Sequence, residues 1–214
     1  MDLRELNIQL TKESLKKETP RDILIIQTIH TIDEMIKIIN TLISNLRERY
    51  GYYAPRISRL ENHEEFLDCI SKKIKEDIGL DFTEDDLNSV IEISSEIRNL
   101  IKLEKSQEKY LEKLAQEICP KLLNIATPLI AARLIDHAGS LKHLAELPSS
   151  TIQVLGAEKA LFRHIKTGAK APKFGIIFTH PNITKAPQEL KGKSARQLSS
   201  EISKAVKIDY FRQK

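Results

Sequence analysis

Apolar residues recur at heptad spacing along the first quarter of the chain, in steps that alternate between four and three. The stripe consists of Ile25, Ile29, Ile32, Ile36, Ile39, Ile43, Leu46 and Tyr50. Such steps place apolar side chains on one face of an α-helix, and a stripe sustained over about four heptads is typical of a coiled coil. The stretch Thr19-Pro20-Arg21-Asp22 predicts where this helix starts, with Thr19 as the N-cap and Pro20 in the first turn.

A second stripe begins near residue 90 and is interrupted by polar residues at positions 104 and 107. It consists of Val90, Ile93, Ile97, Leu100, Glu104, Gln107, Leu111, Leu114 and Ile118. The preceding Thr83-Glu84-Asp85-Asp86 has the pattern of a helix start. Between the two stripes, Phe66, Leu67, Ile70 and Ile74 have helical spacing. The sequence therefore predicts that residues 21–118 form two long helices folded back into an antiparallel coiled coil, with a shorter helix at the turn.

The predicted coiled coil has two interpretations. At 1.5 Å per residue its first helix would be about 45 Å long, which is longer than a compact small domain needs. This length favours a dimerisation or spacer arm over an ordinary helical hairpin packed on its own domain. The residues expected to make the coiled-coil or dimer contacts are Ile25, Ile29, Ile32, Ile36, Ile39, Ile43, Leu46, Ile97, Leu100, Leu111 and Leu114.

Residues 120–155 have the pattern of a compact helical core. Pro120 starts a run whose broad apolar face is formed by Leu122, Leu123, Ile125, Leu129, Ile130 and Leu134. Gly139 is expected to cap this run, and the amphipathic segment 141–147 is expected to stop at Pro148. The mainly apolar stretch 122–135 is too short and too polar for a membrane span. Gly and Pro together number 15 of 214 residues, so we expect an all-α fold, with the coiled coil followed by a compact helical domain over residues 119–214.

Charge is distributed unevenly along the chain. Residues 1–155 contain 21 Lys/Arg and 26 Asp/Glu, a net charge of −5, whereas residues 156–214 contain 13 and 4, a net charge of +9. Clustered positive charge of this kind is typical of proteins that bind nucleic acid. The alternative is a solubilising basic tail, but the segment also contains residues typical of a folded core, namely Leu161, Phe162, Ile176, Ile177 and Phe178.

The stretch GAEKALFRHIKTGAKAPKFG, residues 156–175, begins this basic segment. We expect a helix from Ala157 to Lys166, closed by Gly168, with Leu161, Ile165 and Phe162 facing inward. The cations expected to contact RNA are Lys159, Arg163 and Lys166 on the outward face, Lys170 and Lys173 in the next loop, and Lys185, Lys191, Lys193 and Arg196 beyond it. Such residues supply affinity and salt dependence but little sequence specificity. The alternative is a solvated basic face.

The sequence contains no specific motif for catalysis or metal binding; Ser14-x-x-Lys17 and Lys166-Thr167-Gly168 match two β-lactamase motifs, but each is short enough to occur by chance. Cys69 and Cys119 form no Cys-x-x-Cys pair, and none of the six histidines has the i, i+4 spacing of a helical zinc site. Neither nucleotide-phosphate loop motif occurs, so we expect no metal, no cofactor and no catalytic residue. His164 has two open roles, RNA contact or packing, whereas His180 is expected to be structural. An RNA-processing enzyme that uses one of these histidines is the enzymatic alternative.

The block AGSLKHLAELPSSTIQVLGAEKALFRHIKTGAKAPKFGIIFTHPNI, residues 138–183, resembles the signature of the Nop domain. The resemblance is strongest in GAEKALFRHIKTG and in the run Gly-x-Ile-Phe-x-His-Pro. The family comprises the archaeal scaffold of box C/D small ribonucleoproteins and its eukaryotic nucleolar and spliceosomal relatives. The resemblance extends upstream through TPRDILIIQTIHTIDEMIKIINTLISNLRERYG and downstream through KGKSARQLSSEISKAVKIDYF.

The resemblance implies an all-helical scaffold without catalytic activity that supports guide-directed RNA 2′-O-methylation. Its implied partners are box C/D guide RNA, a ribosomal-type protein that binds the kink-turn of that RNA, and a second copy of the chain held through the coiled coil. By the same resemblance, the helix from Ala157 and the loop to Lys173 would meet the joint RNA–protein surface. Full-length archaeal scaffolds of this family carry, before the coiled coil, a domain that recruits the fibrillarin methyltransferase. Residues 1–20 would then be a linker or a remnant of that domain, which argues against fibrillarin recruitment here.

Two further expectations concern location and the main functional alternative. The N-terminus has no apolar signal-peptide core, and two cysteines cannot form a disulfide framework, so an intracellular location is expected. The resemblance implies that this location is the cytoplasm of an archaeal cell. The functional alternative is a protein-interaction module that pairs with full-length scaffold chains and has no RNA role of its own.

Overall fold

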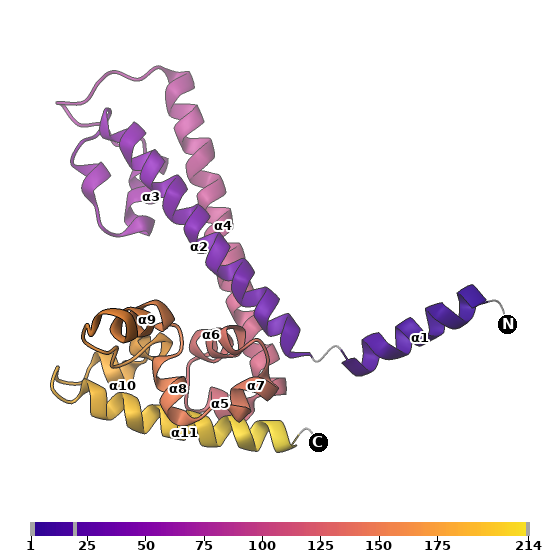
Figure 1. Cartoon of the computed structure of the whole chain (residues 1–214). Coiled ribbons are helices and arrows are strands. Elements are labelled where there is room, and N and C mark those ends of the chain that lie inside the picture. The colour runs from indigo at the N-terminus through magenta and orange to yellow at the C-terminus, as the bar shows by residue number, and fades with distance from the viewer. Residues whose placement is uncertain (1–2, 19–20, 213–214) are drawn as a thin grey trace. The chain divides into compact units, whose positions relative to one another are not determined.

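The computed structural model describes residues 3–18 and 21–212, with the side chains of residues 14–18 excepted. Over these residues the chain forms eleven α-helices, two 3-10 helices and no strand, which confirms the expected all-α fold (Figure 1). The elements are α1 (Leu3–Glu18), α2 (Asp22–Gly51), η1 (Ile57–Arg59), α3 (His63–Ser71), α4 (Glu84–Ile118), α5 (Pro120–Leu123), α6 (Pro128–Ala138), α7 (Leu141–Glu146), α8 (Ser149–Val154), α9 (Glu158–Thr167), η2 (Ile176–Thr179), α10 (Pro181–Thr184) and α11 (Lys191–Arg212).

The chain divides into two compact units. The first unit consists of residues 1–30 and 109–214, and the second unit consists of residues 31–108. Both boundaries fall inside a long helix, α2 or α4, so each of these helices contributes residues to both units. The predicted N-cap at Thr19 and the adjacent Pro20 lie outside the described residues.

In the second unit, residues of α2 and α4 pack together with α3 around one apolar core. Its buried members are Ile39, Ile43, Leu46, Tyr50, Tyr53, Ala54, Phe66, Leu67, Ile70, Val90 and Ile97. The hydroxyl of Tyr50 donates a hydrogen bond to the carbonyl of Ile74 over 2.8 Å, and burial raises the pKa of Tyr50 well above its usual value. The helix start predicted at Thr83 is confirmed, because the Asp86 amide donates to the Thr83 hydroxyl and the Thr83 amide donates to the Asp86 carboxylate.

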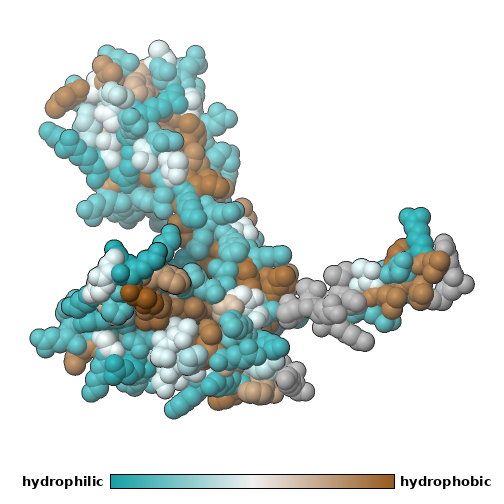
Figure 2. Space-filling view, in the orientation of Figure 1, coloured by the Kyte–Doolittle hydropathy of each residue, from teal (hydrophilic) through white to brown (hydrophobic). Residues whose placement is uncertain are grey.

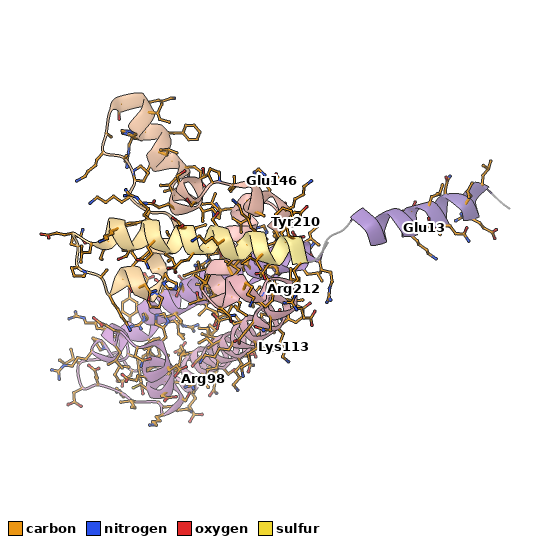
Figure 3. The ribbon with its side chains drawn as sticks, turned by 90° about the horizontal axis from the view of Figure 1, so that it is seen from below. Glu13, Arg98, Lys113, Glu146, Tyr210 and Arg212 are labelled. Atoms are coloured by element: carbon orange, nitrogen blue, oxygen red, sulfur yellow. The ribbon has the colours of Figure 1, made fainter. Side chains whose placement is uncertain are left out.

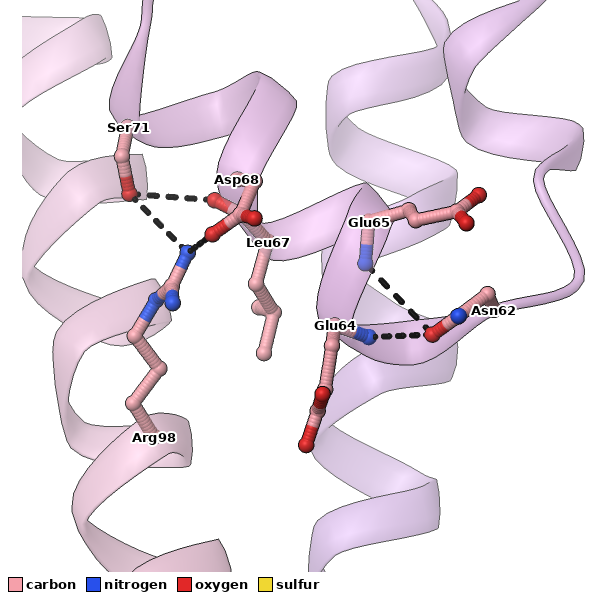
Figure 4. A network of polar contacts seen from close by, with 7 residues as sticks. All are labelled: Asn62, Glu64, Glu65, Leu67, Asp68, Ser71 and Arg98. Atoms are coloured by element: carbon pink, nitrogen blue, oxygen red, sulfur yellow. Dashed lines mark hydrogen bonds and ion pairs between the residues drawn. The ribbon is translucent and has the colours of Figure 1, made fainter.

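Polar contacts fix the short helix α3 at both of its ends (Figure 4). At its start, the side-chain oxygen of Asn62 accepts from the amides of Glu64 and Glu65, which satisfies two amides that lack a partner within the helix. Nearer its end, the guanidinium of Arg98 on α4 forms a 2.6 Å ion pair with Asp68. The predicted shorter helix between the two long ones is therefore present and is tied to α4.

The predicted coiled-coil stripes are largely buried within this one chain. In α2, Ile25, Ile29 and Ile32 are fully buried, as is Ile97 in α4. Ile39, Ile43, Leu46, Leu111 and Leu114 are also buried, whereas Ile36 and Leu100 are half-buried. Most of these side chains therefore offer no open surface to a second molecule.

In the first unit, helix α11 packs against α5, α7, α8 and η2 (Figures 1 and 3). Its core side chains are Ala195, Leu198, Ile202, Ala205 and Val206. In Figure 3, the labels for Tyr210 and Arg212 mark the C-terminal end of this helix. The helix thus supports most of the short helices that precede it in the chain.

Two buried carboxylates cap short helices of the first unit. Asp209 of α11 accepts from the amides of Lys121 and Leu122, at 3.1 and 2.8 Å, at the start of α5. Asp22 of α2 accepts from the amide of Leu141, over 2.7 Å, at the start of α7. Helix starts carry unpaired amides and a partial positive charge, so a carboxylate at these positions is stabilising. These long-range caps fix α5 and α7 against distant parts of the chain.

The run predicted to start at Pro120 is interrupted. Helix α5 begins at Pro120, as expected, but ends at Leu123, and α6 begins separately at Pro128. Proline lacks an amide hydrogen, so it fits the first turn of a new helix better than the interior of a continuous one. The left-handed cap at Gly139, with φ of 82°, and the end of α7 before Pro148 agree with expectation. Among the described residues, no helix is long and apolar enough to cross a membrane.

Candidate nucleic-acid interface

Helix α9 forms where the sequence predicts it, with ends shifted by one residue. Its C-terminus is closed by Gly168, which has a φ of 68° and donates its amide to the carbonyl of His164 over 2.9 Å. At its start, the carboxylate of Glu158 accepts from the amide of Gly156 over 2.6 Å. The helix therefore ends at a left-handed glycine cap, and a local hydrogen bond connects its first residue to Gly156.

The predicted inward face of α9 is wrong at two positions. Phe162 is 65% exposed and Ile165 is 69% exposed, whereas Leu161 is half-buried as expected. The half-buried positions are Ala157, Ala160, Leu161 and His164. These follow the i, i+3, i+4, i+7 spacing of one helix face, so the packed side of the helix uses two alanines beside Leu161 and His164 and leaves Phe162 and Ile165 in solvent.

The outward face of α9 combines cations with apolar side chains. Lys159, Arg163 and Lys166 are exposed, and they lie on the same side of the helix as Phe162. The hydropathy view shows brown atoms among teal ones where α9 lies (Figure 2). An amphipathic surface of this kind can contact phosphate through its ammonium and guanidinium groups, and a base or an apolar protein surface through Phe162 and Ile165.

The nine predicted cations share one electrostatic property. Between residues 159 and 200, Glu189 is the one acidic residue against nine Lys/Arg. In the described part of the chain, none of the nine forms an ion pair with a carboxylate. Their positive charge is therefore left available to an anionic partner.

The loop after α9 is pinned to helix α8. The side-chain amide of Gln153 donates to the carbonyl of Lys173 over 2.7 Å, and the Gly175 amide donates to the Gln153 carbonyl over 2.9 Å. A Cβ added at Gly175 would lie 1.9 Å from the carbonyl oxygen of Leu155, so only glycine fits. Lys173 is thus presented from a fixed backbone.

The structure separates the roles of the two candidate histidines. His164 is half-buried, and its Nδ1 contacts the carbonyl of Ala169, which connects the end of α9 to the loop. His180 is buried: its Nε2 lies 3.0 Å from the carbonyl of Ile125, and its Nδ1 accepts from the amide of Asn182. The structural role expected for His180 agrees with these contacts.

The remaining predicted cations lie at three places. Lys170 is exposed in the loop after α9. Lys185 follows α10, and Lys191, Lys193 and Arg196 belong to the first turns of α11. The loop that contains Lys173 lies close to the start of α11, because a Cβ added at Gly192 would lie 3.9 Å from Cδ of Lys173. Lys159, Arg163 and Lys166 instead form their own group on α9.

Two aromatic residues beside these cations were not among the sequence-predicted site residues. One of them, Phe178, was expected in the core, but it is 40% exposed. The rings of Phe174 and Phe178 are stacked with a centroid distance of 4.8 Å and an interplanar angle of 11°. The ammonium of Lys191 lies 5.3 Å from the centroid of the Phe178 ring. The spacing of four residues between the two phenylalanines was the available signal, but it does not by itself show that the rings meet.

Comparison with known proteins gives consistent matches. Residues 70–214 match the Nop family model, described as a snoRNA binding domain, fibrillarin. The chain is 36% identical to a NOP5 family protein of Methanocaldococcus jannaschii over 94% of its own length and 56% of that protein. It is 31% identical to nucleolar protein 58 of Schizosaccharomyces pombe and 34% identical to human nucleolar protein 56, covering 46% and 37% of those proteins. The chain thus spans about half or less of the length of these relatives.

A solved structure has a similar fold. It is described as the crystal structure of a fibrillarin/Nop5p complex, and it matches with a TM-score of 0.59 and 28% sequence identity. The match covers 99% of this chain and 70% of that one.

Proposed function

We propose that this chain, which belongs to the Nop family, is a scaffold without catalytic activity that binds box C/D guide RNA together with the protein that holds its kink-turn. In this role it supports guide-directed RNA 2′-O-methylation, and a separate methyltransferase supplies the chemistry. The proposal depends on the nine Lys/Arg residues between residues 159 and 200, a segment that contains one acidic residue. In the described residues, none of these nine cations is paired with a carboxylate.

The arrangement of these cations supports a polyanionic partner. Like charges held close together without counter-charges repel one another, so a folded protein gains from a partner that neutralises them. A nucleic-acid backbone offers such a partner, because bound Lys/Arg displace condensed counterions from the phosphates. The group on α9 and the group shared by Lys173 and the start of α11 could each contact a different part of the RNA.

The apolar part of α9 supports a composite RNA–protein target. Phe162 and Ile165 are exposed beside three cations, and phosphate alone would not explain two large apolar residues in solvent. A surface made of RNA together with a protein would use both kinds of side chain. We therefore expect tight binding only when the kink-turn RNA already holds its protein.

The first test changes Lys159, Arg163 and Lys166 to Ala and measures affinity for a box C/D RNA that carries its kink-turn protein, at several salt concentrations. Loss of three phosphate contacts should weaken binding and reduce the slope of log K against log salt by about 2 to 3. The matched control changes Lys102, Lys109 and Lys113, three exposed lysines of α4, to Ala and should leave the slope unchanged. An unchanged slope for the α9 variant would contradict phosphate contact.

The second test compares the RNA with and without the kink-turn protein. The composite surface predicts that the chain binds the RNA–protein complex more tightly than either component alone. Equal affinity for free and protein-bound RNA would contradict this part of the proposal and leave only non-specific binding to phosphate.

Self-association is a further part of the proposal, and it must use a surface other than the buried stripes. Ile38 on α2 is 51% exposed and Leu103 on α4 is 48% exposed, although both lie on coiled-coil helices. We expect Ile38→Asp and Leu103→Asp to shift sedimentation toward the monomer, with the exposed Leu190→Asp as the control. If the unaltered chain sediments as a monomer, self-association is contradicted.

A further inference from the structure

The stacked pair of Phe174 and Phe178 is not accounted for by phosphate contacts. Phe178 is 40% exposed, although its neighbour Ile177 is fully buried. The 3-10 turn η2 therefore points one apolar residue into the core and leaves a large aromatic residue at the surface. Exposed aromatic rings beside lysines occur where proteins bind single-stranded nucleic acid, because an unpaired base can stack on the ring.

The backbone under the pair is rigid. Gly175 lies between the two phenylalanines and is held against the carbonyl of Leu155, and the amide of Ile176 donates to that same carbonyl over 2.8 Å. Gly156 packs closely against the side chain of Ile176, because a Cβ added at Gly156 would lie 2.5 Å from Cγ1 of Ile176. A ring held on such a backbone is already ordered before it binds, so little conformational entropy is lost on stacking.

The charges around the ring favour a nucleotide. The Lys191 ammonium lies 5.3 Å from the centroid of Phe178, and the Lys173 side chain lies beside the start of α11. Lys173 directly precedes Phe174 in the chain, and both lysines have long side chains suited to contact the phosphates of a base on the ring. An ammonium near an exposed ring is held more weakly than a stacked base, so Lys191 can move from the ring to a phosphate.

We infer that Phe178, backed by Phe174, is a stacking site for an unpaired RNA base, with Lys173 and Lys191 holding the adjacent phosphates. The inference rests on the proposed function and adds a specific prediction to it. The chain recognises a single-stranded or flipped-out nucleotide at this position, in addition to the backbone contacts made by α9.

The test uses the full chain and two short single-stranded probes, an oligoadenylate and an abasic oligonucleotide with the same backbone length. Phe178→Leu should lower affinity for the oligoadenylate about tenfold and leave affinity for the abasic probe unchanged. It should also leave the salt slope unchanged, since no phosphate contact is lost. Phe178→Tyr should retain affinity, because its ring can still stack.

Two matched variants sharpen the result. Phe211→Leu alters another exposed phenylalanine of the first unit and should leave both affinities unchanged. Lys191→Ala should lower the salt slope by about one and preserve the preference for the probe that has bases. A 2-aminopurine placed in the oligoadenylate should be quenched by the unaltered chain and less so by Phe178→Leu. Thermal unfolding followed by circular dichroism checks that each variant is folded.

The outcomes separate this inference from the proposed function. If the chain binds the RNA–kink-turn protein complex but Phe178→Leu binds both probes like the unaltered chain, the stacking site is wrong and the scaffold proposal stands. If the chain does not bind the complex, the scaffold proposal is wrong. If Phe178→Leu instead weakens binding to the kink-turn protein in the absence of RNA, the ring contacts protein and the stacking site is again wrong.

Discussion

The second unit and the α9–α11 surface of the first unit use the same residue types in opposite ways. In the second unit, Arg98 is paired with Asp68, Lys105 is paired with Glu64, and the phenylalanine Phe66 is fully buried. Along α9 and the start of α11, the cations have no carboxylate partner in the described residues, and Phe162 and Phe178 are exposed. The first arrangement stabilises the fold, whereas the second leaves charge and apolar area available for binding.

Replacing one phenylalanine in each region should give the largest difference in unfolding free energy between the two regions. Phe66→Ala removes a fully buried ring that contacts Tyr50 edge-to-face and lies under the guanidinium of Arg47. The variant should lose about 3 to 5 kcal/mol of unfolding free energy, because the cavity forms in a packed core. Phe162→Ala should change it by less than about 0.5 kcal/mol, because its ring is already in solvent. Urea denaturation measures both, and a large loss for Phe162→Ala would show that α9 packs more tightly than its exposure indicates.

A glycine pair tests the rigidity of the loop that presents Lys173 and the two stacked rings. Gly175→Ala would place a Cβ 1.9 Å from the Leu155 carbonyl oxygen, and neither backbone can move away cheaply. We expect a loss of about 1 to 3 kcal/mol in unfolding free energy and weaker RNA binding. Gly192→Ala is the control: the nearest atom would be 3.9 Å away, in the flexible side chain of Lys173. Equal behaviour of the two variants would argue against a rigid loop.

The sequence alone was sufficient for the parts of the fold that depend on periodicity. The stripes in α2 and α4 and the caps at Thr83, Gly139 and Gly168 require local spacing and residue type, and the structure agrees with them. The family resemblance was visible for the same reason, since the matching block is continuous in sequence. Local rules therefore predicted which elements form and where most of them end.

The candidate interface was less predictable because its features depend on contacts between distant residues. Hydrophobicity alone placed Phe162 and Ile165 inward, but the packed side of α9 contains Ala157 and Ala160, so close approach of the helix decided the face. The position of Phe178 depends on the contact of Gly175 with Leu155, twenty residues away in sequence. No local pattern in a single sequence reports such a contact.

The smallest expected effects come from replacing one arginine in each region. One replacement should change the unfolding free energy, and the other should change the salt dependence of RNA binding. Arg98→Ala removes a partly exposed ion pair with Asp68, which should cost about 0.2 to 1 kcal/mol of unfolding free energy and leave RNA binding unchanged. Arg163→Ala removes an exposed cation without a carboxylate partner, so it should leave stability almost unchanged while lowering the salt slope of RNA binding by about one.

Urea denaturation and RNA titrations at several salt concentrations measure both quantities for both variants. A double-mutant cycle of Arg98→Ala with Asp68→Ala isolates the energy of the pair from other effects of the substitutions. If Arg98→Ala weakened RNA binding as much as Arg163→Ala, the division between paired cations that stabilise the fold and unpaired cations that bind RNA would be wrong. In that case, the presence or absence of a carboxylate partner would not indicate whether a cation stabilises the fold or binds RNA.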